Sequence, residues 1–220
     1  MAQNSKSVHA YNSVESESRI FLAQTKLKDR EEIKDALVKA FGLRGIRNYE
    51  FNDYYFSRDN CANGETTRAR EWLTYRSADG VETKQKVQVV TSAPTVESYD
   101  GIPFKMGGKK SKLAFETVAE AVASIEKDGL RPWITVRKRN GEYYDICLEG
   151  VEARIAFEDI VCVCDGEQKS TEMAEIEVMS LDRATVARTY MEILAVLGLD
   201  KKELIGEPMI AIADGLLKRE

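Results

Sequence analysis

The sequence predicts an α+β fold: an antiparallel β-barrel that encloses a polar tunnel, with helices packed on its outside. Three observations support this prediction. Segments typical of β-strands dominate the 220-residue chain. In most of them charged and apolar residues alternate, so each strand has one charged face and one apolar face. The segments typical of helices carry apolar stripes, which can cover the apolar faces of the strands.

The size and composition of the chain indicate one compact domain over residues 14–220. Hydrophobic residues make up 43% of the sequence and charged residues 31%, which suits a single core. The net charge of −5 argues against non-specific binding to nucleic acid. No apolar run approaches the roughly 20 residues of a membrane span, and residues 1–13 lack the hydrophobic centre of a secretory signal. We therefore expect a cytoplasmic protein whose residues 1–13 form a disordered lead.

The cysteines and the single histidine limit the chemistry that the chain can perform. Cys61, Cys147, Cys162 and Cys164 show no zinc-binding spacing, and we expect them to be reduced thiols. The only histidine, His9, falls in the lead, so a nucleophile activated by histidine is excluded. Any metal ion would be held by carboxylates, which favours Mg²⁺ or Mn²⁺ over zinc.

The first part of the chain predicts a strand, a helix and a second strand. The first strand covers roughly 14–23. Asp29 is a helix cap with a glutamate three residues later, an apolar stripe follows, and Gly42 ends the helix. The aromatic-rich segment 49–56 is typical of a strand.

A β-hairpin and a patternless stretch come next. Segments 66–76 and 81–90 alternate and are joined by the turn dipeptide Asp79-Gly80. Residues 91–116 show little pattern, and we expect a loop or insertion there. Its Gly107–Lys110 stretch is expected to be a flexible surface segment or a lid over the tunnel mouth.

The rest of the chain predicts a helix, four strands and two more helices. Thr117 opens a capping box for a helix to about Asp128. A second hairpin is expected from 132–139, a turn at Asn140-Gly141 and the strand after it. Two further strands cover 151–163 and 171–180. Ser180 caps a long helix that Gly198 ends, and a shorter helical tail begins near Asp200.

The charged faces of the strands belong together. One charged face alone fits an ordinary sheet with a solvated side. Here six strands share the pattern, with acidic residues in the first and last strands and basic residues between them. A closed barrel turns one face of every strand toward a common interior. The residues predicted to share this interior face are Glu15, Glu17, Arg19, Arg68, Arg70, Arg76, Lys84, Lys86, Arg137, Arg139, Arg154, Glu158, Glu175 and Glu177.

Such an interior suits a polyanion together with divalent cations. Arginine and lysine would bind phosphate oxygens, and the carboxylates would hold a metal ion that bridges them. Trp72 and Trp133 are expected to be packing aromatics, although Trp72 has the parity of the tunnel side.

The order of the motifs resembles the CYTH superfamily, the triphosphate tunnel metalloenzymes. The matching segments are Glu15-Ser-Glu17-Ser-Arg19, Asp53-Tyr54-Tyr55-Phe56, Arg68-Ala-Arg70, Leu73-Thr74-Tyr75-Arg76, the strand with Arg137 and Arg139, the strand 153–160 and Glu175-Ile176-Glu177. Two departures stand out. Arg19 replaces the lysine of the first motif, and Lys84 and Lys86 stand where the family has a strand with two glutamates. The late acidic residue is Glu158 or Asp159, and side-chain parity favours Glu158.

The resemblance implies a metal-dependent triphosphatase with Glu15, Glu17 and Arg19 in catalytic roles. The implied ligands of Mg²⁺ or Mn²⁺ are Glu15, Glu17, Glu158, Glu175 and Glu177. The implied phosphate-binding residues are Arg19, Arg68, Arg70, Arg76, Lys84, Lys86, Arg137, Arg139 and Arg154. Candidate substrates are inorganic triphosphate, a nucleotide, thiamine triphosphate and an RNA 5′ end. A class IV-type adenylate cyclase and a non-catalytic binder of phosphorylated ligands are the alternatives.

Overall fold

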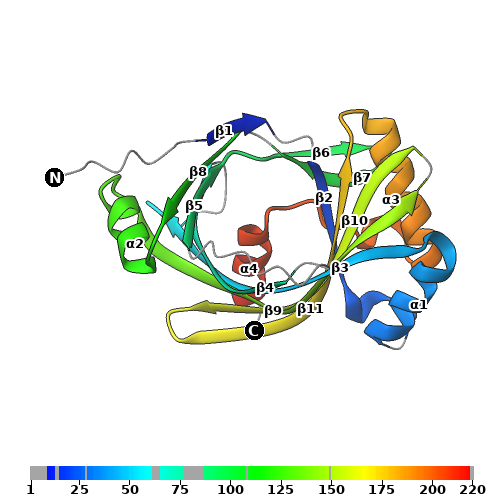
Figure 1. The fold of residues 1–220 in the computed structure, drawn as a ribbon, viewed down its shortest axis with the longest axis horizontal. Helices are drawn as coiled ribbons and strands as arrows, with labels where there is room; N and C mark the ends of the chain where they lie inside the picture. Colours follow the sequence, from blue (N-terminus) through cyan, green and yellow to red (C-terminus); the bar gives the residue numbers. More distant parts are fainter. Residues whose placement is uncertain are drawn as a thin grey trace.

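A strongly curved antiparallel sheet forms the body of the protein (Figure 1). The computed structural model describes residues 9–12, 15–27, 29–60, 65–76, 87–107, 109–148 and 150–218. In this part of the chain eleven strands pair in the order β1-β8-β5-β4-β3-β9-β10-β11-β2-β7-β6. The sheet curls into an open ring (Figure 1), in which β1 and β6 are the two edge strands and do not pair with each other in the described residues. The predicted α+β class is confirmed.

The strands differ greatly in length, and the longest form the middle of the sheet. Their bounds are β1 His9–Asn12, β2 Glu15–Phe21, β3 Leu43–Ser57, β4 Thr66–Arg76, β5 Val87–Ser92, β6 Thr95–Tyr99, β7 Ile102–Met106, β8 Lys109–Phe115, β9 Arg131–Leu148, β10 Val151–Cys164 and β11 Glu167–Met179. The helices are α1 Arg30–Phe41, α2 Val118–Glu126, α3 Arg183–Leu197 and α4 Met209–Leu217, with 3₁₀ turns at Leu22–Gln24 and Lys201–Glu203. None of these helices is long and apolar enough to cross a membrane.

Side-chain caps begin the first three α-helices. Asp29 caps α1 and Thr117 caps α2, as predicted, because each side chain accepts a hydrogen bond from the backbone N–H three residues later. The prediction that Ser180 caps α3 is wrong. The side chain of Asp182 accepts from the N–H of Thr185 at 3.1 Å, and it stands directly before the first helical residue.

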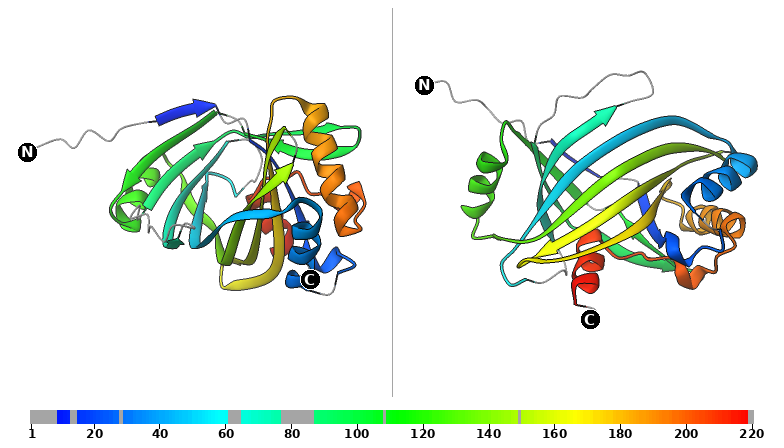
Figure 2. Two further views of the ribbon diagram at one scale, coloured as in Figure 1. Left: turned by 45° about the vertical axis from the view of Figure 1, so that its right-hand side comes forward. Right: turned by 90° about the horizontal axis from the view of Figure 1, so that it is seen from below.

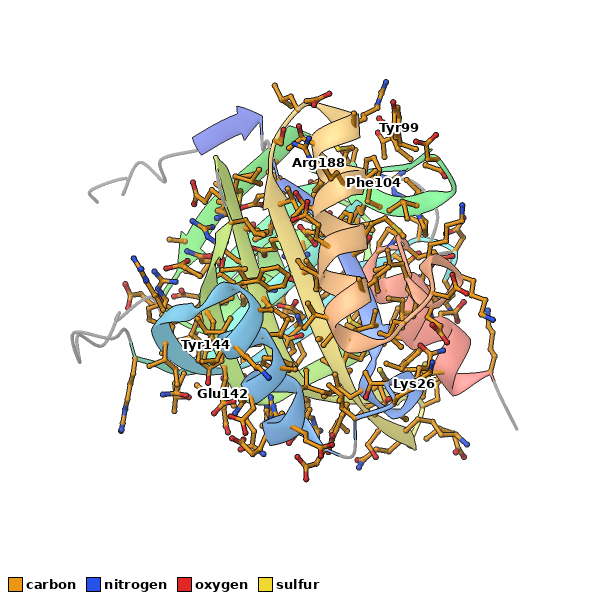
Figure 3. All side chains as sticks on the ribbon, turned by 90° about the vertical axis from the view of Figure 1, so that its right-hand side faces the viewer. Lys26, Tyr99, Phe104, Glu142, Tyr144 and Arg188 are labelled. Carbon is orange, nitrogen blue, oxygen red and sulfur yellow. The ribbon has the colours of Figure 1, made fainter. Side chains whose placement is uncertain are left out.

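Three helices cover the outside of the ring, as predicted. Helices α1 and α3 lie together over the outer faces of β10, β11 and β2 (Figures 2 and 3). Ile20, Ile155 and Ile176 from these strands pack against Tyr190 of α3 in the main core. On another side of the ring, α2 packs against β4, β5 and β8. The apolar outer faces of the strands are thereby buried.

The fourth helix lies inside the ring (Figure 1), which corrects the prediction that all helices pack outside. Its Met209, Ile210, Ile212 and Ala213 are buried. They pack against apolar residues on the inner face of β9, β10 and β11, namely Ile134, Val136, Ile160, Cys162 and Met173. The interior is therefore apolar at the end that α4 fills, and charged beyond it. Cys162 and Cys164 pack in this cluster as free thiols.

The predicted hairpin turn at Asn140-Gly141 is absent. Strand β9 runs through this dipeptide, and the pairing with β3 and β10 shifts by one residue there. Asn140 has a φ of +48°, so the dipeptide forms a β-bulge. Asparagine and glycine adopt the same positive φ in tight turns and in bulges, which explains the wrong prediction.

Residues 91–116, predicted as a loop or insertion, form the end of β5 and strands β6, β7 and β8. Asp100 and Gly101, both with positive φ, make the two-residue turn between β6 and β7. The strands were missed because they are short and alternate weakly. Lys109, predicted as part of a surface segment or lid, begins β8.

The N-terminal prediction also needs one correction. His9–Asn12, placed in the disordered lead 1–13, form β1 and pair with β8. The turn Asp79-Gly80, together with Lys84, Lys86 and Cys61, lies outside the residues that the structure describes, as does the side chain of Cys147.

Candidate functional site

Two adjoining cavities inside the ring form a tunnel. The first, of about 230 Å³, is bordered by β2, β4, β5, β7, β8 and the start of α4; we call it the charged cavity. The second, of about 360 Å³, is bordered by β3, β4, β9, β10 and β11; we call it the aromatic cavity, after the five aromatic side chains in its wall. Both are lined by Arg70, Trp72, Lys138, Glu175 and Glu177, so they meet at these residues.

Charged side chains of both signs line the tunnel. The carboxylates are Glu15, Glu17, Asp53, Glu158, Glu175 and Glu177. The cations are Arg19, Arg47, Arg68, Arg70, Lys105, Lys110, Lys112, Lys138 and Arg154. Nine cations thus face six carboxylates, and the described part of the lining has a positive formal charge. This confirms the predicted convergence of charged strand faces on one interior for β2, β10, β11 and the first part of β4.

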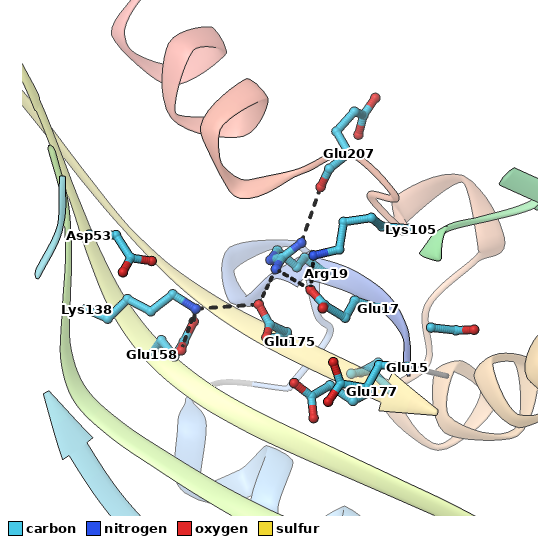
Figure 4. Close-up of polar contacts among 12 residues, drawn as sticks. Glu15, Glu17, Arg19, Asp53, Lys105, Lys138, Glu158, Glu175, Glu177 and Glu207 are labelled. Atoms are coloured by element: carbon cyan, nitrogen blue, oxygen red, sulfur yellow. Dashed lines mark hydrogen bonds and ion pairs between the residues drawn. The ribbon is translucent and has the colours of Figure 1, made fainter. Parts of the chain in front are cut away.

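Arg19 of β2 is the centre of the charged network (Figure 4). Its side chain is 4% exposed, and Nη2 donates to Glu17 at 3.0 Å and also to Glu175. Glu17 is paired with Lys105 of β7 as well. Burial raises the pKa of Glu17, but Lys105 and Arg19 outweigh burial and hold it at about 2. Burial likewise raises the pKa of Glu175, and Arg19 and Lys138 bring it well below its usual range.

Lys138 of β9 links the network to the other side of the tunnel. Its Nζ donates to Glu158 at 2.7 Å and to Glu175 at 3.5 Å (Figure 4). Tyr49 donates its hydroxyl proton to the same oxygen of Glu158. Burial lowers the pKa of Lys138, but the two carboxylates outweigh burial and raise it. Lys138 is therefore a fixed ammonium in the wall of the tunnel.

Asp53 of β3 positions two of the predicted phosphate-binding arginines. Its carboxylate, 1% exposed, accepts two hydrogen bonds from Arg70 at 2.7 Å each and lies 3.2 Å from Nε of Arg68. Burial raises the pKa of Asp53, and Arg70 and Arg68 more than reverse this effect. The paired geometry fixes the guanidinium of Arg70 in the wall.

Among the described tunnel carboxylates, Glu177 has a negative charge that nearby cations balance least. It stands directly opposite Glu17 in the β11–β2 pairing, where like charges repel. Its nearest partners are the hydroxyl of Tyr143, which donates at 2.8 Å, and Arg154 at 4.0 Å. Burial, Glu175 and Glu17 raise its pKa to about 8.

The acidic side chains fit a hard divalent cation in their chemistry. Within the described ranges, no three acidic, cysteine or histidine side chains converge on one point as a ready metal site. However, Glu15, Glu17 and Glu177 supply oxygen donors, and a cation would relieve the repulsion at Glu177. Four of the five predicted ligands are already paired with cations: Glu15 with Lys110, Glu17 with Arg19 and Lys105, Glu158 with Lys138, and Glu175 with Arg19. Metal binding by the five carboxylates therefore stays a prediction.

Most of the predicted site residues in the described chain do line the tunnel. They are Glu15, Glu17, Arg19, Arg68, Arg70, Arg154, Glu158, Glu175 and Glu177. Three others do not. Arg137 is exposed, Arg139 donates to the carbonyl of Phe51 and the side chain of Asn52 on the outside, and Arg76 is exposed beyond the bulge in β4.

The misplaced residues share one cause, an error in side-chain parity. We assumed that the apolar residues Ile134 and Val136 face outward, which would turn Arg137 and Arg139 inward. Ile134 and Val136 instead face inward, because they pack against α4 at that end of the tunnel. Lys138, two residues after Val136, has the same parity and also faces inward. In β4 the bulge at Leu73 reverses the parity, so Tyr75 enters the tunnel and Arg76 leaves it.

Sequence reasoning missed several lining residues. They are Arg47, Asp53, Lys105, Lys110, Lys112 and Lys138. Lys105, Lys110 and Lys112 belong to the segment predicted as a loop. Lys110 and Lys112 alternate in sequence, which is the signal that could have identified them as one strand face.

Comparison with solved structures places this fold among known ones. PH1819 from Pyrococcus horikoshii OT3 is 16% identical with a TM-score of 0.57, covering 93% of this chain and 99% of that chain. A chain of the Schizosaccharomyces pombe Mediator head module is 11% identical with a TM-score of 0.51, covering 84% and 94%. These two likenesses establish the fold alone.

A weaker likeness concerns HpAC1 from Hippeastrum, for which a dominant triphosphatase activity is described. It is 12% identical, with a TM-score of 0.49, and the match covers 91% of this chain and 94% of that chain. No protein-family model matches the chain, and no curated protein matches it in sequence.

Proposed function

We propose that the tunnel binds the phosphate chain of a triphosphate-containing compound and, with Mg²⁺ or Mn²⁺, hydrolyses it. The observation that carries this proposal is the lining: nine cationic side chains and six carboxylates on the inner face of one ring of strands. Polyphosphate chains need several cationic donors in a row, and their hydrolysis depends on positioning and charge neutralisation. The resemblance of the motifs to triphosphate tunnel metalloenzymes points to the same chemistry.

The charged cavity supplies donors along its whole length. Arg68 and Arg70 face it from β4, Lys105 from β7, and Lys110 and Lys112 from β8. The Nε–H group of Arg19 is buried without a hydrogen-bond partner among the described residues. Buried donors are rarely left unpaired, so this group favours an anionic ligand beside it.

Each group has a distinct part in the proposed reaction. The arginines and lysines bind and align the phosphates, and Arg19 and Lys138 neutralise charge that develops on the oxygens. Glu15, Glu17 and Glu177 hold the divalent cation. When bound, this cation polarises the phosphoryl group and the attacking water.

A screen of triphosphorylated compounds with Mg²⁺ and with Mn²⁺ tests the proposal. We expect phosphate release from at least one compound, lost in Glu177→Gln and retained in Glu192→Gln, a matched change on the exposed face of α3. Product analysis with ATP separates hydrolysis to ADP from cyclisation to cyclic AMP. Metal-independent turnover, or full activity of Glu177→Gln, would refute the proposed use of the acidic residues.

A second candidate, a binder without turnover, is favoured by one observation. Glu158 and Glu175 are saturated by Lys138 and Arg19, which leaves fewer carboxylates for metal. In that case inorganic triphosphate binds equally well with and without Mg²⁺ and no phosphate is released.

A further inference from the structure

We propose that the ligand carries a planar aromatic group beside its phosphate chain and that the aromatic cavity binds this group. This inference rests on the proposed binding of a phosphate chain in the charged cavity. It narrows the ligand to a class such as nucleoside triphosphates and excludes bare inorganic triphosphate as the preferred one.

The two ends of the tunnel differ in chemistry. The charged cavity is lined mainly by charged and hydroxyl side chains. The wall of the aromatic cavity also carries charged side chains, but it adds five aromatic ones, namely Tyr49, Phe51, Trp72, Tyr75 and Tyr143. A ligand that was anionic along its whole length would leave these five rings without a partner. A ligand with an anionic part and an aromatic part matches both ends.

The aromatic side chains form one continuous surface. Phe51 and Trp72 meet edge to face with ring centroids 5.0 Å apart, and Trp72 meets Tyr75 in the same way at 5.5 Å. Tyr49 and Phe51 stack at 5.6 Å. Trp72 and Tyr75 are only half-buried, so part of this surface stays open to the cavity. The volume of the aromatic cavity, about 360 Å³, lies in the usual range for small-molecule sites, roughly 300–1,000 Å³.

Two bulges turn aromatic side chains into this cavity. On β4, the bulge at Leu73 brings in Tyr75 where regular alternation would bring in Thr74. On β9, the bulge at Asn140-Gly141 brings in Tyr143. Bulges often re-aim side chains next to functional sites. Both bulges lie beside the aromatic cavity. This indicates that the bulges set the positions of its aromatic side chains, which are therefore more than incidental packing.

Polar groups at the junction and the rim suit the edges of such a ligand. Arg70, which lines both cavities, has its guanidinium carbon 3.7 Å from the centre of the Phe51 ring, so it connects the phosphate end to the aromatic end. At the rim, Asp145 lies 3.3 Å from Arg47 and 3.5 Å from Arg154. The Arg47 and Arg154 side chains also line the aromatic cavity and can donate hydrogen bonds to ring substituents.

Titration calorimetry of the full chain with ATP and with inorganic triphosphate, each used in Mg²⁺ as an imido analogue that resists hydrolysis, tests the inference. We expect ATP to bind more tightly than inorganic triphosphate. Tyr75→Leu, at a ring that lines the aromatic cavity and not the charged cavity, should weaken ATP binding about tenfold, the effect of losing one stacked base, and leave the affinity for inorganic triphosphate within twofold. Tyr75→Phe, which keeps a ring, should restore most of the affinity for ATP. Tyr99→Leu, an exposed aromatic on β6, should change neither ligand.

The outcomes separate the two proposals. If neither ligand binds the wild-type protein, the proposed function fails and this inference fails with it. If inorganic triphosphate binds as tightly as ATP, or if Tyr75→Leu weakens the binding of both equally, phosphate binding stands and the aromatic inference is refuted. If Tyr75→Leu does not fold, Tyr75→Met gives the same comparison with a larger side chain.

Discussion

Arg137 and Lys138 are adjacent in the sequence and lie in opposite environments. Arg137 is exposed, whereas the Lys138 side chain is 5% exposed and contacts Glu158 at 2.6 Å. Removing one partner of a buried ion pair leaves a buried charge without compensation, which is far more costly than losing an exposed charge.

A matched pair of substitutions tests this difference. Lys138→Met is expected to lower the free energy of unfolding by about 3–5 kcal/mol, measured by urea denaturation near neutral pH. Arg137→Met, one residue away, is expected to change it by less than about 0.5 kcal/mol. Equal effects of the two substitutions would contradict the inward position of Lys138.

Glu177 makes stability depend on pH. Its pKa is raised from 4.5 to about 8 in the folded protein, so the folded state binds more protons than the unfolded state between these values. The free energy of unfolding therefore falls as pH rises through this window. Glu177→Gln removes that loss. Without divalent cations, we expect its melting temperature to match the wild type near pH 5 and to exceed it by several degrees near pH 9.

Glu192→Gln is the control for this comparison, because Glu192 is exposed on α3. Its difference from the wild type should be the same at both pH values. A constant difference for Glu177→Gln as well would show that Glu177 titrates normally.

Strand β9 shows which features of an element can be read from sequence. Its alternation on both sides of Asn140-Gly141 predicts two strands joined by a turn at that dipeptide. The structure has one continuous strand with a bulge there. Whether the dipeptide turns the chain or only kinks it depends on the neighbours: β3 and β10 pair with β9 on both sides of Gly141, and these are long-range contacts.

The same limit applies to the candidate site. Glu15, Glu17, Glu175 and Glu177 were identified because charged residues alternate regularly in their strands. The prediction of side-chain parity was wrong on β9, where the inner face is itself apolar. Nothing in the local sequence shows that α4 fills that end of the ring. The ion pair of Arg19 with Glu175 and its hydrogen bond to the carbonyl of Glu207 join segments more than a hundred residues apart, so no local pattern predicts them.

Two glycines test the packing of the elements. A Cβ at Gly141 would lie 2.6 Å from both the ring and the carbonyl oxygen of Tyr49. Gly141→Ala is therefore expected to destabilise the protein by about 1–3 kcal/mol, the usual cost of overpacking. At Gly215, within α4, a Cβ would meet nothing within 4 Å, and Gly215→Ala is expected to stabilise by about 0.5–1 kcal/mol. Thermal denaturation of both variants measures the contrast.

At the scale of the whole molecule, the lining of the tunnel has an excess of cationic side chains, which a polyanion would neutralise. Inorganic triphosphate should therefore raise the melting temperature, because a ligand that binds only the folded state stabilises it. The rise should shrink as sodium chloride increases from about 50 to 500 mM, since salt screens the attraction. A rise that is independent of salt would indicate binding outside the charged lining.

The segment that leads into α4 is hydrogen-bonded to Arg19, the residue at the centre of the charged network in the tunnel. Arg19 exchanges two backbone hydrogen bonds with Ile205, at 2.9 and 2.8 Å, and its Nη1 donates to the carbonyl of Glu207 at 3.2 Å. Gly206 between them lies against the backbone of Phe104, and α4 begins directly afterwards. An anion that pulls the Arg19 guanidinium toward itself would weaken the hydrogen bond from Arg19 to Glu207. By the same coupling, release of the C-terminal segment would weaken binding of the anion by the same factor. Binding of an anion in the tunnel and docking of the C-terminal segment are thus linked equilibria.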